Sequence, residues 1–183
     1  IKHSSLIACP GCYPTASLIP LIPLLEESCI QKNRIIVDAK SGVTGAGRAE
    51  KLDNLFPEIS EAMHPYSIAQ HRHIPEIEQA LSIASEKDVS ITFTPHIVPM
   101  NRGIIATIYA ELEEGVSQLT AKSILTTKFC DEPFVSVLDG DIVPQTRMVR
   151  GSNVCAINIF MDRISNQVII VSAIDNLLKG ASG

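Results

Sequence analysis

The stretch Cys9-Pro10-Gly11-Cys12-Tyr13-Pro14-Thr15 (CPGCYPT) joins two apolar segments of different character. The short run before it, Ser5–Ala8 (SLIA), predicts a strand that its Pro-Gly pair ends. The apolar spacing after it, from Pro14 to about Ser28, predicts a buried helix. The stretch therefore predicts a strand, a tight turn and a helix that Cys12 opens.

Outward from this stretch, the apolar patterning predicts more strands than helices. A helix starts near Ile74, with Pro75 suited to its first position, and Ser117 is placed to cap a second helix. Residues 49–72 predict a long loop, and Asp175–Gly180 predicts a turn that leaves the sheet. The predicted strands are Arg34–Ala39, Val89–Thr94, Ile104–Leu112, Phe134–Leu138 and a hairpin of Asn153–Ile164 with Gln167–Ile174 around Ser165 and Asn166; the second helix is Gln118–Cys130. This order predicts an α+β fold with helices on one face of a sheet.

The composition excludes several classes of protein. With 183 residues and 45% hydrophobic content, the chain can bury a full core. A net charge of −5 and the lack of a Lys/Arg cluster argue against nucleic-acid binding. The longest apolar run, Leu18–Leu25, contains Pro20 and Pro23 and is too short to span a membrane. Five cysteines without a framework pattern favour a reducing compartment.

Cys12 is the first candidate for chemistry, because a thiol at a helix N-terminus is stabilised as a thiolate by the helix dipole and free N–H groups. We therefore expect a depressed pKa and the fastest reaction with iodoacetamide among the five cysteines. Three alternatives remain open from the residues alone. In the first, Cys12 is a buried structural cysteine, and in the second it forms a redox pair with Cys9. In the third, it belongs to a zinc site with His71 and His73, although the spacing of these histidines matches no standard zinc finger.

Two polar loops could serve such a nucleophile. Ser41–Arg48 (SGVTGAGR) carries three glycines whose backbone could approach a cofactor closely, and Arg48 could pair with a phosphate or carboxylate. His71-Arg72-His73-Ile74-Pro75-Glu76 places two imidazoles just ahead of a helix. Histidine is the usual general acid/base, so this loop and Cys12 form a plausible base–nucleophile set. A flexible turn and a polar loop remain the alternative interpretations.

Five motifs together resemble the N-acetyl-γ-glutamyl-phosphate reductase family, and they come in the family's order. They are PGCYPT at 10–15, SGVTGAGR at 41–48, HRHIPEI at 71–77, TPHIVPMNRG at 94–103 and DNLLKGA at 175–181. The chain departs from the family at Cys9, where asparagine is common, and at Pro20, where a small residue is usual. The resemblance thus favours Cys12 as one nucleophile and Cys9 as a bystander.

The resemblance implies an enzyme of arginine biosynthesis. It would reduce N-acetyl-γ-glutamyl phosphate with NADPH through a cysteine thioester, and would release phosphate. Because the chain begins at Ile1 without methionine, we expect a segment of a longer protein. Residues 1–183 would be its catalytic and dimerisation domain, with a mixed, largely antiparallel sheet like the C-terminal domain of glyceraldehyde-3-phosphate dehydrogenase. The NADPH-binding Rossmann domain would lie outside this chain.

The same resemblance suggests roles for individual residues. Cys12 is the nucleophile, His73 the acid/base and His71 the second choice for that role. Candidates around the cofactor are Ser41, Gly42, Gly45 and Asn176, with Lys179 near the nicotinamide, and candidates for the substrate are Arg48, Arg102 and Glu76. We further expect a homo-oligomer in the bacterial cytosol or the plant plastid, and no membrane or nucleic-acid partner. The alternatives are a dimer-forming domain without turnover and a C-x-x-C thiol-redox protein.

Overall fold

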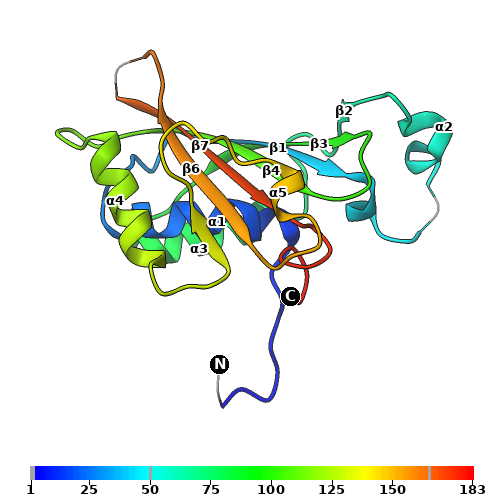
Figure 1. Cartoon of the computed structure of the whole chain (residues 1–183), viewed down its shortest axis with the longest axis horizontal. Coiled ribbons are helices and arrows are strands. Elements are labelled where there is room, and N and C mark those ends of the chain that lie inside the picture. Colours follow the sequence, from blue (N-terminus) through cyan, green and yellow to red (C-terminus); the bar gives the residue numbers. More distant parts are fainter. Residues whose placement is uncertain (1–2, 50, 165) are drawn as a thin grey trace.

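The computed structural model describes residues 3–49, 51–164 and 166–183, and its elements follow the predicted order. Figure 1 shows them around one central sheet. The helical elements are α1 (Cys12–Glu26), η1 (Val43–Ala46), η2 (Leu52–Asn54), α2 (Phe56–Ile59), α3 (Ile74–Ser85), α4 (Gln118–Phe129) and α5 (Thr146–Val149). The strands are β1 (Ile35–Gly42), β2 (His64–Pro65), β3 (Ile91–Val98), β4 (Ile104–Glu111), β5 (Val135–Val137), β6 (Cys155–Met161) and β7 (Gln167–Ile174).

The sheet has seven strands in the order β2-β3-β1-β4-β7-β6-β5. The pairs β1–β3 and β5–β6 are parallel, and the other four neighbouring pairs are antiparallel. Helices α1, α3 and α4 cover one face (Figure 1). The predicted α+β class with a mixed, largely antiparallel sheet is therefore confirmed.

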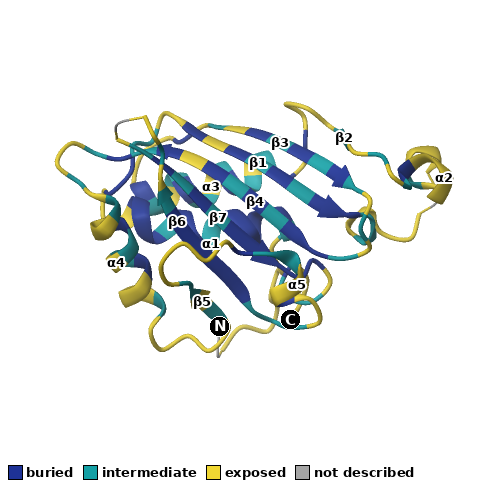
Figure 2. Cartoon of the chain, turned by 45° about the horizontal axis from the view of Figure 1, so that its top comes forward, coloured by how far each residue is buried: buried dark blue, intermediate teal, exposed yellow. Residues whose placement is uncertain are grey.

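One short helix, α5, departs from the expectation that all helices lie on a single face. Its Val149 packs against Ala156 and Ala173, which point away from α1, α3 and α4 because they alternate with core residues of β6 and β7. The main core lies on the other side of the sheet. There Val37, Ile108 and Ile170 are fully buried beneath the three long helices, as the dark strands and helix faces of Figure 2 show.

The face opposite the long helices carries an apolar row across four strands. Ile36 pairs with Tyr109, Tyr109 with Ile169, and Ile169 with Phe160, so the four side chains lie side by side. Ile36 is 43% exposed and Tyr109 36% exposed. Asp38, which alternates with the core residues of β1, adds a carboxylate on this face within ion-pair distance of Lys40 and His96. We call this surface the open sheet face.

The segment before α1 corrects the first prediction from the sequence. The run Ser5–Ala8 forms no strand, and Leu6 and Ile7 are exposed, because no described strand lies beside it to complete a ladder. α1 begins at Cys12, as predicted, and continues through the buried Pro20 and Pro23. Burial between the sheet and the neighbouring helices α3 and α4 stabilises it despite the missing N–H groups.

The remaining elements agree with the sequence pattern. Pro75 lies in the first turn of α3, and Ser117 caps α4 by accepting the N–H of Thr120 at 3.1 Å. The β6–β7 hairpin is antiparallel, with Asn166 in a left-handed conformation; Ser165 in its turn lies outside the described residues. The predicted loop 49–72 contains only the short η2, α2 and β2, apart from residue 50, which is not described. This arm extends beyond the sheet (Figure 1).

Candidate active site

Cys12 is the first residue of α1, and its surroundings come from distant parts of the chain. Gly11 is the N-cap and has no side chain to cap the helix. A Cβ atom added at Gly180 would lie 2.8 Å from the Cβ of Cys12, so the C-terminal turn packs directly against the nucleophile candidate. Cys9, by contrast, is exposed in the segment before the helix. The structure thus separates the two cysteines by environment.

The start of α3 lies against the same point. A Cβ atom added at Gly11 would lie 2.4 Å from Nε2 of His73, so only glycine allows this imidazole to pack so closely. The N–H of Gly11 donates to Oε1 of Glu76 at 2.9 Å. The structure therefore brings His73 and Glu76 to the residue that precedes Cys12. Glu76, expected to bind substrate, accepts this backbone N–H with one of its two carboxylate oxygens.

The two histidines have different surroundings. Nδ1 of His71 accepts the backbone N–H of His73 at 3.1 Å, and the His71 ring packs edge-on against Tyr13, Tyr66 and Phe93. Nδ1 of His73 is buried and has no hydrogen-bond partner among the described residues. The His73 ring also packs edge-on, against Tyr13 and His71, so the two imidazoles share one aromatic cluster and differ in that Nδ1 of His73 has no partner among the described residues.

Both imidazoles are neutral at pH 7. Burial, with the charges of His73 and Arg72, lowers the pKa of His71 to about 4. Burial and the charge of Arg72 lower the pKa of His73 as well. A neutral imidazole can accept a proton, so His73 is in the form that a general base requires.

The pKa of Cys12 contradicts the expectation from the helix N-terminus. Burial raises it above the ordinary value, and the nearby charge of Glu76 acts in the same direction. The backbone N–H groups of Tyr13 and Cys12 and the charge of Arg72 oppose this, but they do not outweigh burial. The thiol is thus protonated at rest, and it could act as a nucleophile only after a base had taken its proton.

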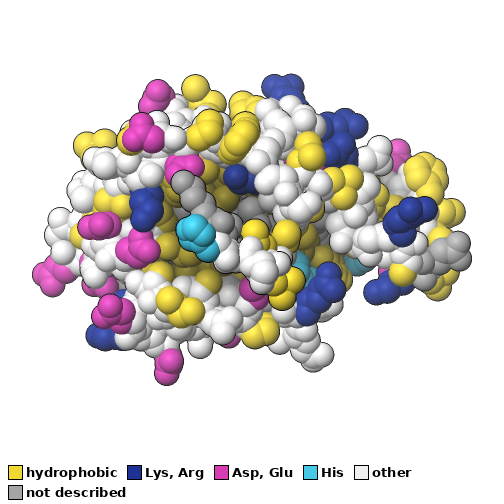
Figure 3. All heavy atoms as spheres, turned by 90° about the horizontal axis from the view of Figure 1, so that it is seen from below, with side chains coloured by type: hydrophobic (Ala, Val, Ile, Leu, Met, Phe, Trp, Pro, Cys, Tyr) yellow, Lys and Arg dark blue, Asp and Glu magenta, His cyan; other side chains and the backbone are white. Residues whose placement is uncertain are grey.

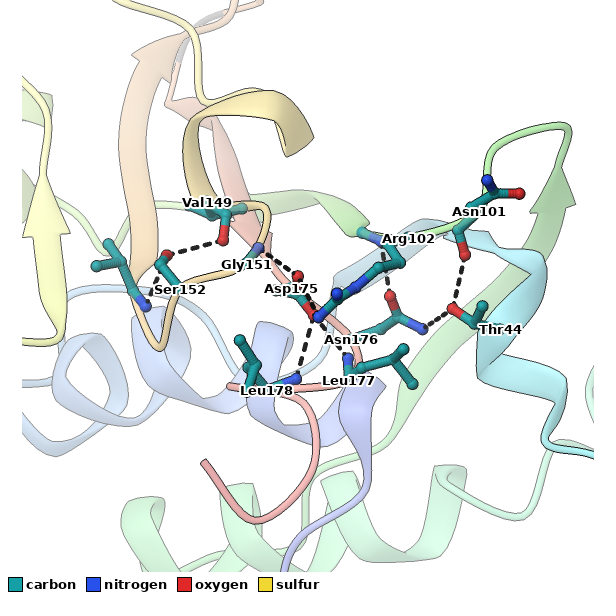
Figure 4. A network of polar contacts seen from close by, with 12 residues as sticks. Thr44, Asn101, Arg102, Val149, Gly151, Ser152, Asp175, Asn176, Leu177 and Leu178 are labelled. Atoms are coloured by element: carbon teal, nitrogen blue, oxygen red, sulfur yellow. Dashed lines mark hydrogen bonds and ion pairs between the residues drawn. The ribbon is translucent and has the colours of Figure 1, made fainter.

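A polar network holds Asn176, one of the residues expected around the cofactor (Figure 4). Oδ1 of Asn176 accepts the N–H of Gly103 at 2.6 Å, and its Nδ2 donates to Oγ1 of Thr44 at 2.9 Å. A Cβ atom added at Gly45 would lie 2.8 Å from Oγ of Ser41 and 3.6 Å from Nδ2 of Asn176. The structure brings Ser41, Gly45 and Asn176 together. Both ends of the Asn176 amide, however, already bind protein groups, the backbone of Gly103 and the hydroxyl of Thr44.

Arg102 is held in the same network by Asp175, which the sequence motif contained without suggesting a role. The guanidinium Nη2 lies 2.9 Å from Oδ2 of the fully buried Asp175, and Gly151 donates its N–H to that oxygen at 2.7 Å. Burial alone would raise the pKa of Asp175, but hydrogen bonds from Gly151, Leu177, Arg102 and Leu178 hold it below its usual range. Arg102 is therefore engaged in holding the C-terminal turn, which accounts for it without a substrate.

A polar cavity of about 410 Å³ lies beside Ser41. Its lining includes Gly42, Gly45, Tyr66, His71, Arg72 and Lys51. The hydroxyl of Tyr66 donates to that of Tyr13 at 2.9 Å, so the residue after Cys12 reaches the cavity wall. The analysis of the sequence missed Tyr13, Tyr66, Arg72 and Lys51. Tyr13 and Arg72 lie within motifs that were recognised for other residues, whereas Tyr66 and Lys51 lie in the predicted loop 49–72.

Two further candidates lie on the surface or point elsewhere. Arg48 is exposed just after η1. Nζ of Lys179 lies 5.8 Å from the centre of the Phe134 ring. Within residues 3–49, 51–164 and 166–183, no three His, Cys, Asp or Glu side chains are grouped to hold a metal ion. Over the same residues, no helix combines the length and apolarity that crossing a bilayer requires.

The family model described as "Semialdehyde dehydrogenase, dimerisation domain" matches residues 12–176. The chain therefore belongs to the semialdehyde dehydrogenase family through this domain. Its sequence is 51% identical over 183 residues to a "Probable N-acetyl-gamma-glutamyl-phosphate reductase, chloroplastic" of Arabidopsis thaliana, covering 100% of this chain and 46% of the relative. It is 48% identical to the N-acetyl-gamma-glutamyl-phosphate reductase of Lachnoclostridium phytofermentans, over 100% of this chain and 53% of that protein.

These values mean that the chain spans about half the length of the curated relatives it matches. Among solved structures, it is similar to aspartate semialdehyde dehydrogenase II of Vibrio cholerae, with a TM-score of 0.75 and 16% identity over 96% of this chain and 58% of the other. The Francisella tularensis aspartate semialdehyde dehydrogenase gives a TM-score of 0.72 and 13% identity, over 94% and 60%. The structures therefore confirm the fold, and the sequences confirm the recognised family of relatives.

Proposed function

We propose that this chain is the catalytic and dimerisation domain of an NADPH-dependent N-acetyl-γ-glutamyl-phosphate reductase of arginine biosynthesis. The observation that carries the proposal is the contact of His73 with Gly11, because it sets a neutral imidazole beside the helix start that Cys12 opens. The identity of about half of all residues with named reductases supports the proposed substrate class.

The proposed chemistry begins with a proton transfer from the Cys12 thiol to the neutral His73. The thiolate then attacks the acyl carbon of the substrate, the C–O bond to phosphate breaks, and a thioester remains on Cys12. The backbone N–H groups at the start of α1 face the carbonyl oxygen as it gains negative charge. Reduction of the thioester gives a thiohemiacetal. When His73 takes the proton of its hydroxyl group, the C–S bond breaks, because thiolate is a good leaving group, and the semialdehyde is released with Cys12 regenerated.

The cofactor, NADPH, would supply the hydride for that reduction. The cavity beside Ser41 is bordered by Gly42, Gly45 and Ala46, and these small residues leave room for a flat ring. Ser41 and the two glycines are therefore the residues of this chain proposed to border the nicotinamide. The Rossmann domain that would bind the rest of the cofactor is proposed to be supplied by the longer protein.

The charges at this end of the domain suit an anionic substrate. Arg72 and Lys51 line the cavity together with Asp53, whereas Figure 3 shows acidic side chains gathered mostly toward the end that carries α4. A cationic region beside the nucleophile attracts phosphate and carboxylate groups. We therefore propose Arg72 and Lys51, rather than Arg102, as the cations that meet the substrate; Arg48 remains a candidate.

The partner proposed for the assembled protein is a second copy, which the dimerisation domain of the family supports. The compartment is proposed to be the plastid stroma or the cytosol, following the chloroplastic relative for a plant protein. The alternatives differ in what they predict for a pure sample. If the chain serves only to form a dimer, the sample shows no turnover. If the protein is a thiol-redox protein, its activity depends on Cys9 as much as on Cys12.

The test is turnover of the full-length protein, followed by NADPH oxidation with N-acetyl-γ-glutamyl phosphate. Cys12→Ser should abolish it and Cys9→Ser should leave most of it. His73→Asn should lower kcat by about 10²–10⁴-fold, since that is the usual cost of losing a general acid/base. Equal loss from both cysteine variants would favour the redox pair, and unchanged turnover in His73→Asn would remove that base from the mechanism.

A further inference from the structure

The peptide that precedes the nucleophile is held by a side chain from another helix. Gly11 is the N-cap of α1 and offers no side chain, and its own N–H donates to Oε1 of Glu76 at 2.9 Å. Glu76 lies 65 positions further along the chain, in the first turn of α3. A hydrogen bond to a charged acceptor is among the stronger ones in proteins. The bond therefore ties the first turns of α1 and α3 together at Cys12.

Glu76 and His73 act on Gly11 from the same helix end. His73 is the N-cap of α3 and Glu76 follows three positions later, which places both side chains on one face. Nε2 of His73 packs against Gly11 so closely that a Cβ atom there would lie 2.4 Å away. One turn of α3 thus contacts Gly11 through its imidazole and its carboxylate. The position of Cys12 relative to His73 depends on that pair of contacts.

We propose that Glu76 is a positioning residue, which holds the Gly11 peptide so that Cys12 faces His73 in one geometry. The proposal rests on the proposed role of Cys12 as nucleophile. In this proposal the carboxylate of Glu76 binds the Gly11 backbone and does not bind the substrate. Misplacing a reacting group by about 1 Å can cost about 10²-fold in rate, so such a bond has a large effect on catalysis without touching the substrate.

The carboxylate of Glu76 also has an electrostatic effect on Cys12, and this effect can be tested. Its negative charge lies close enough to raise the pKa of Cys12, in the same direction as burial. Glutamine keeps an oxygen that can accept the N–H of Gly11 but removes the charge, whereas alanine removes both. The two substitutions therefore separate the hydrogen bond from the charge.

The chain contains a matched control in the same helix. Oε1 of Glu78 accepts the N–H of Ile91 at 3.0 Å, so it also caps a distant backbone group, at the start of β3 rather than at Cys12. Glu78→Ala loses a comparable bond. Any effect that is specific to the nucleophile should be absent from this variant.

The experiment compares Glu76→Gln, Glu76→Ala and Glu78→Ala in the full-length protein with three measurements. Amide hydrogen exchange of the peptide that carries Gly11 should speed up by about tenfold or more in Glu76→Ala, and much less in Glu76→Gln. Iodoacetamide labelling of Cys12 should shift to lower pH in both. The kcat should fall by at least about tenfold in Glu76→Ala, and Gln should restore most of it.

Two results would overturn the proposal. One is unchanged exchange at Gly11 in Glu76→Ala. The other is an equal loss of kcat in the Gln and Ala variants while Gly11 stays protected in Gln, which would mean that the charge acts on the substrate. Exchange and labelling do not depend on turnover. If the protein reduces no acyl phosphate, they still decide the role of Glu76, so the failure of this proposal can be told from failure of the proposed function.

Discussion

At the scale of the residue, the environment of Cys12 reverses what its position in the sequence suggests. A helix N-terminus favours a thiolate, but burial by the C-terminal turn and by α3 has the larger effect and raises the pKa. The reactivity of the thiol therefore depends on a base and on a bound substrate rather than on a resting thiolate. We therefore expect a different order of labelling from the one that the sequence suggested.

We predict that iodoacetamide labels Cys9 and Cys130 before Cys12 at pH 7 in the absence of substrate. Both are exposed, whereas Cys12 is half-buried with a raised pKa. The labelling rate of Cys12 should climb as pH rises past 9, the ordinary value for a thiol. Mass spectrometry of the labelled peptides measures the order. Fastest labelling of Cys12 at neutral pH would contradict the raised pKa and restore the original expectation.

His71 provides a prediction about stability and pH. Its pKa falls from 6.5 to about 4 on folding, so the folded state stays neutral where the unfolded state takes up a proton. The stabilising contribution is complete above pH 6.5 and is lost as pH falls through 4. A shift of that size corresponds to about 3 kcal/mol of unfolding free energy.

Urea unfolding of the chain at pH 7 and at pH 4.5 measures this contribution. In His71→Gln the loss of stability between the two pH values should shrink, whereas in His3→Gln, at an exposed site, it should stay as in the wild type. A wild-type loss that His71→Gln leaves unchanged would mean that other groups titrate in this range.

At the scale of the element, the turn after β7 is the part of the site that a small change should disturb most. A Cβ atom added at Gly180 would lie 2.8 Å from the Cβ of Cys12 and 2.9 Å from the backbone of Asn176. Neither neighbour is the end of a flexible side chain, so the turn has to move. The hydrogen bonds of Asp175 to this turn resist that movement.

We therefore predict that Gly180→Ala lowers kcat of the full-length protein by about tenfold or more, because it displaces Cys12 or the turn that covers it. Ala181→Ser, at the exposed next position, is the matched control and should leave kcat unchanged. Steady-state turnover with both variants provides the measurement. Full activity in Gly180→Ala would show that the contact has no bearing on the nucleophile.

The local sequence pattern was enough to predict most helices and strands, but it could not predict the contacts between elements that lie far apart in the chain. Pro75 marked the start of α3, and Ser117 marked the start of α4, because each signal lies within one helical turn. Nothing local shows that Arg102 meets Asp175, 73 positions away. For the same reason, the burial that determines the pKa of Cys12 could not be predicted. Ser5–Ala8 failed because a strand needs a partner that no local pattern supplies.

At the scale of the whole molecule, the open sheet face is the surface that we expect a second copy to cover. Its row of Ile36, Tyr109, Ile169 and Phe160 presents apolar side chains beside the ion pairs of Asp38, which is the mixture found at stable interfaces. The family's dimerisation domain supports self-association, and the long helices already cover the opposite face.

We predict that the pair of changes Ile36→Glu and Tyr109→Glu, which places two like charges side by side on this face, converts the oligomer into a monomer, as measured by analytical ultracentrifugation. Ile83→Glu, at an exposed position on the outer side of α3, should leave the oligomer intact. Charges buried in an interface without partners cost several kcal/mol, so the effect should be large. An unchanged sedimentation coefficient in the double variant would place the interface elsewhere.

The contact between Gly180 and Cys12 also sets the order in which a ribosome can finish this site. The thiol emerges near the beginning of the domain and the turn that covers it near the end, since chains are made from the N-terminus. Throughout the synthesis of the residues between them, the nascent domain carries a cysteine that the C-terminal turn does not yet cover. A product that stops before Asp175 contains Cys12 but never completes its surroundings, so premature termination leaves a thiol that is open to oxidation.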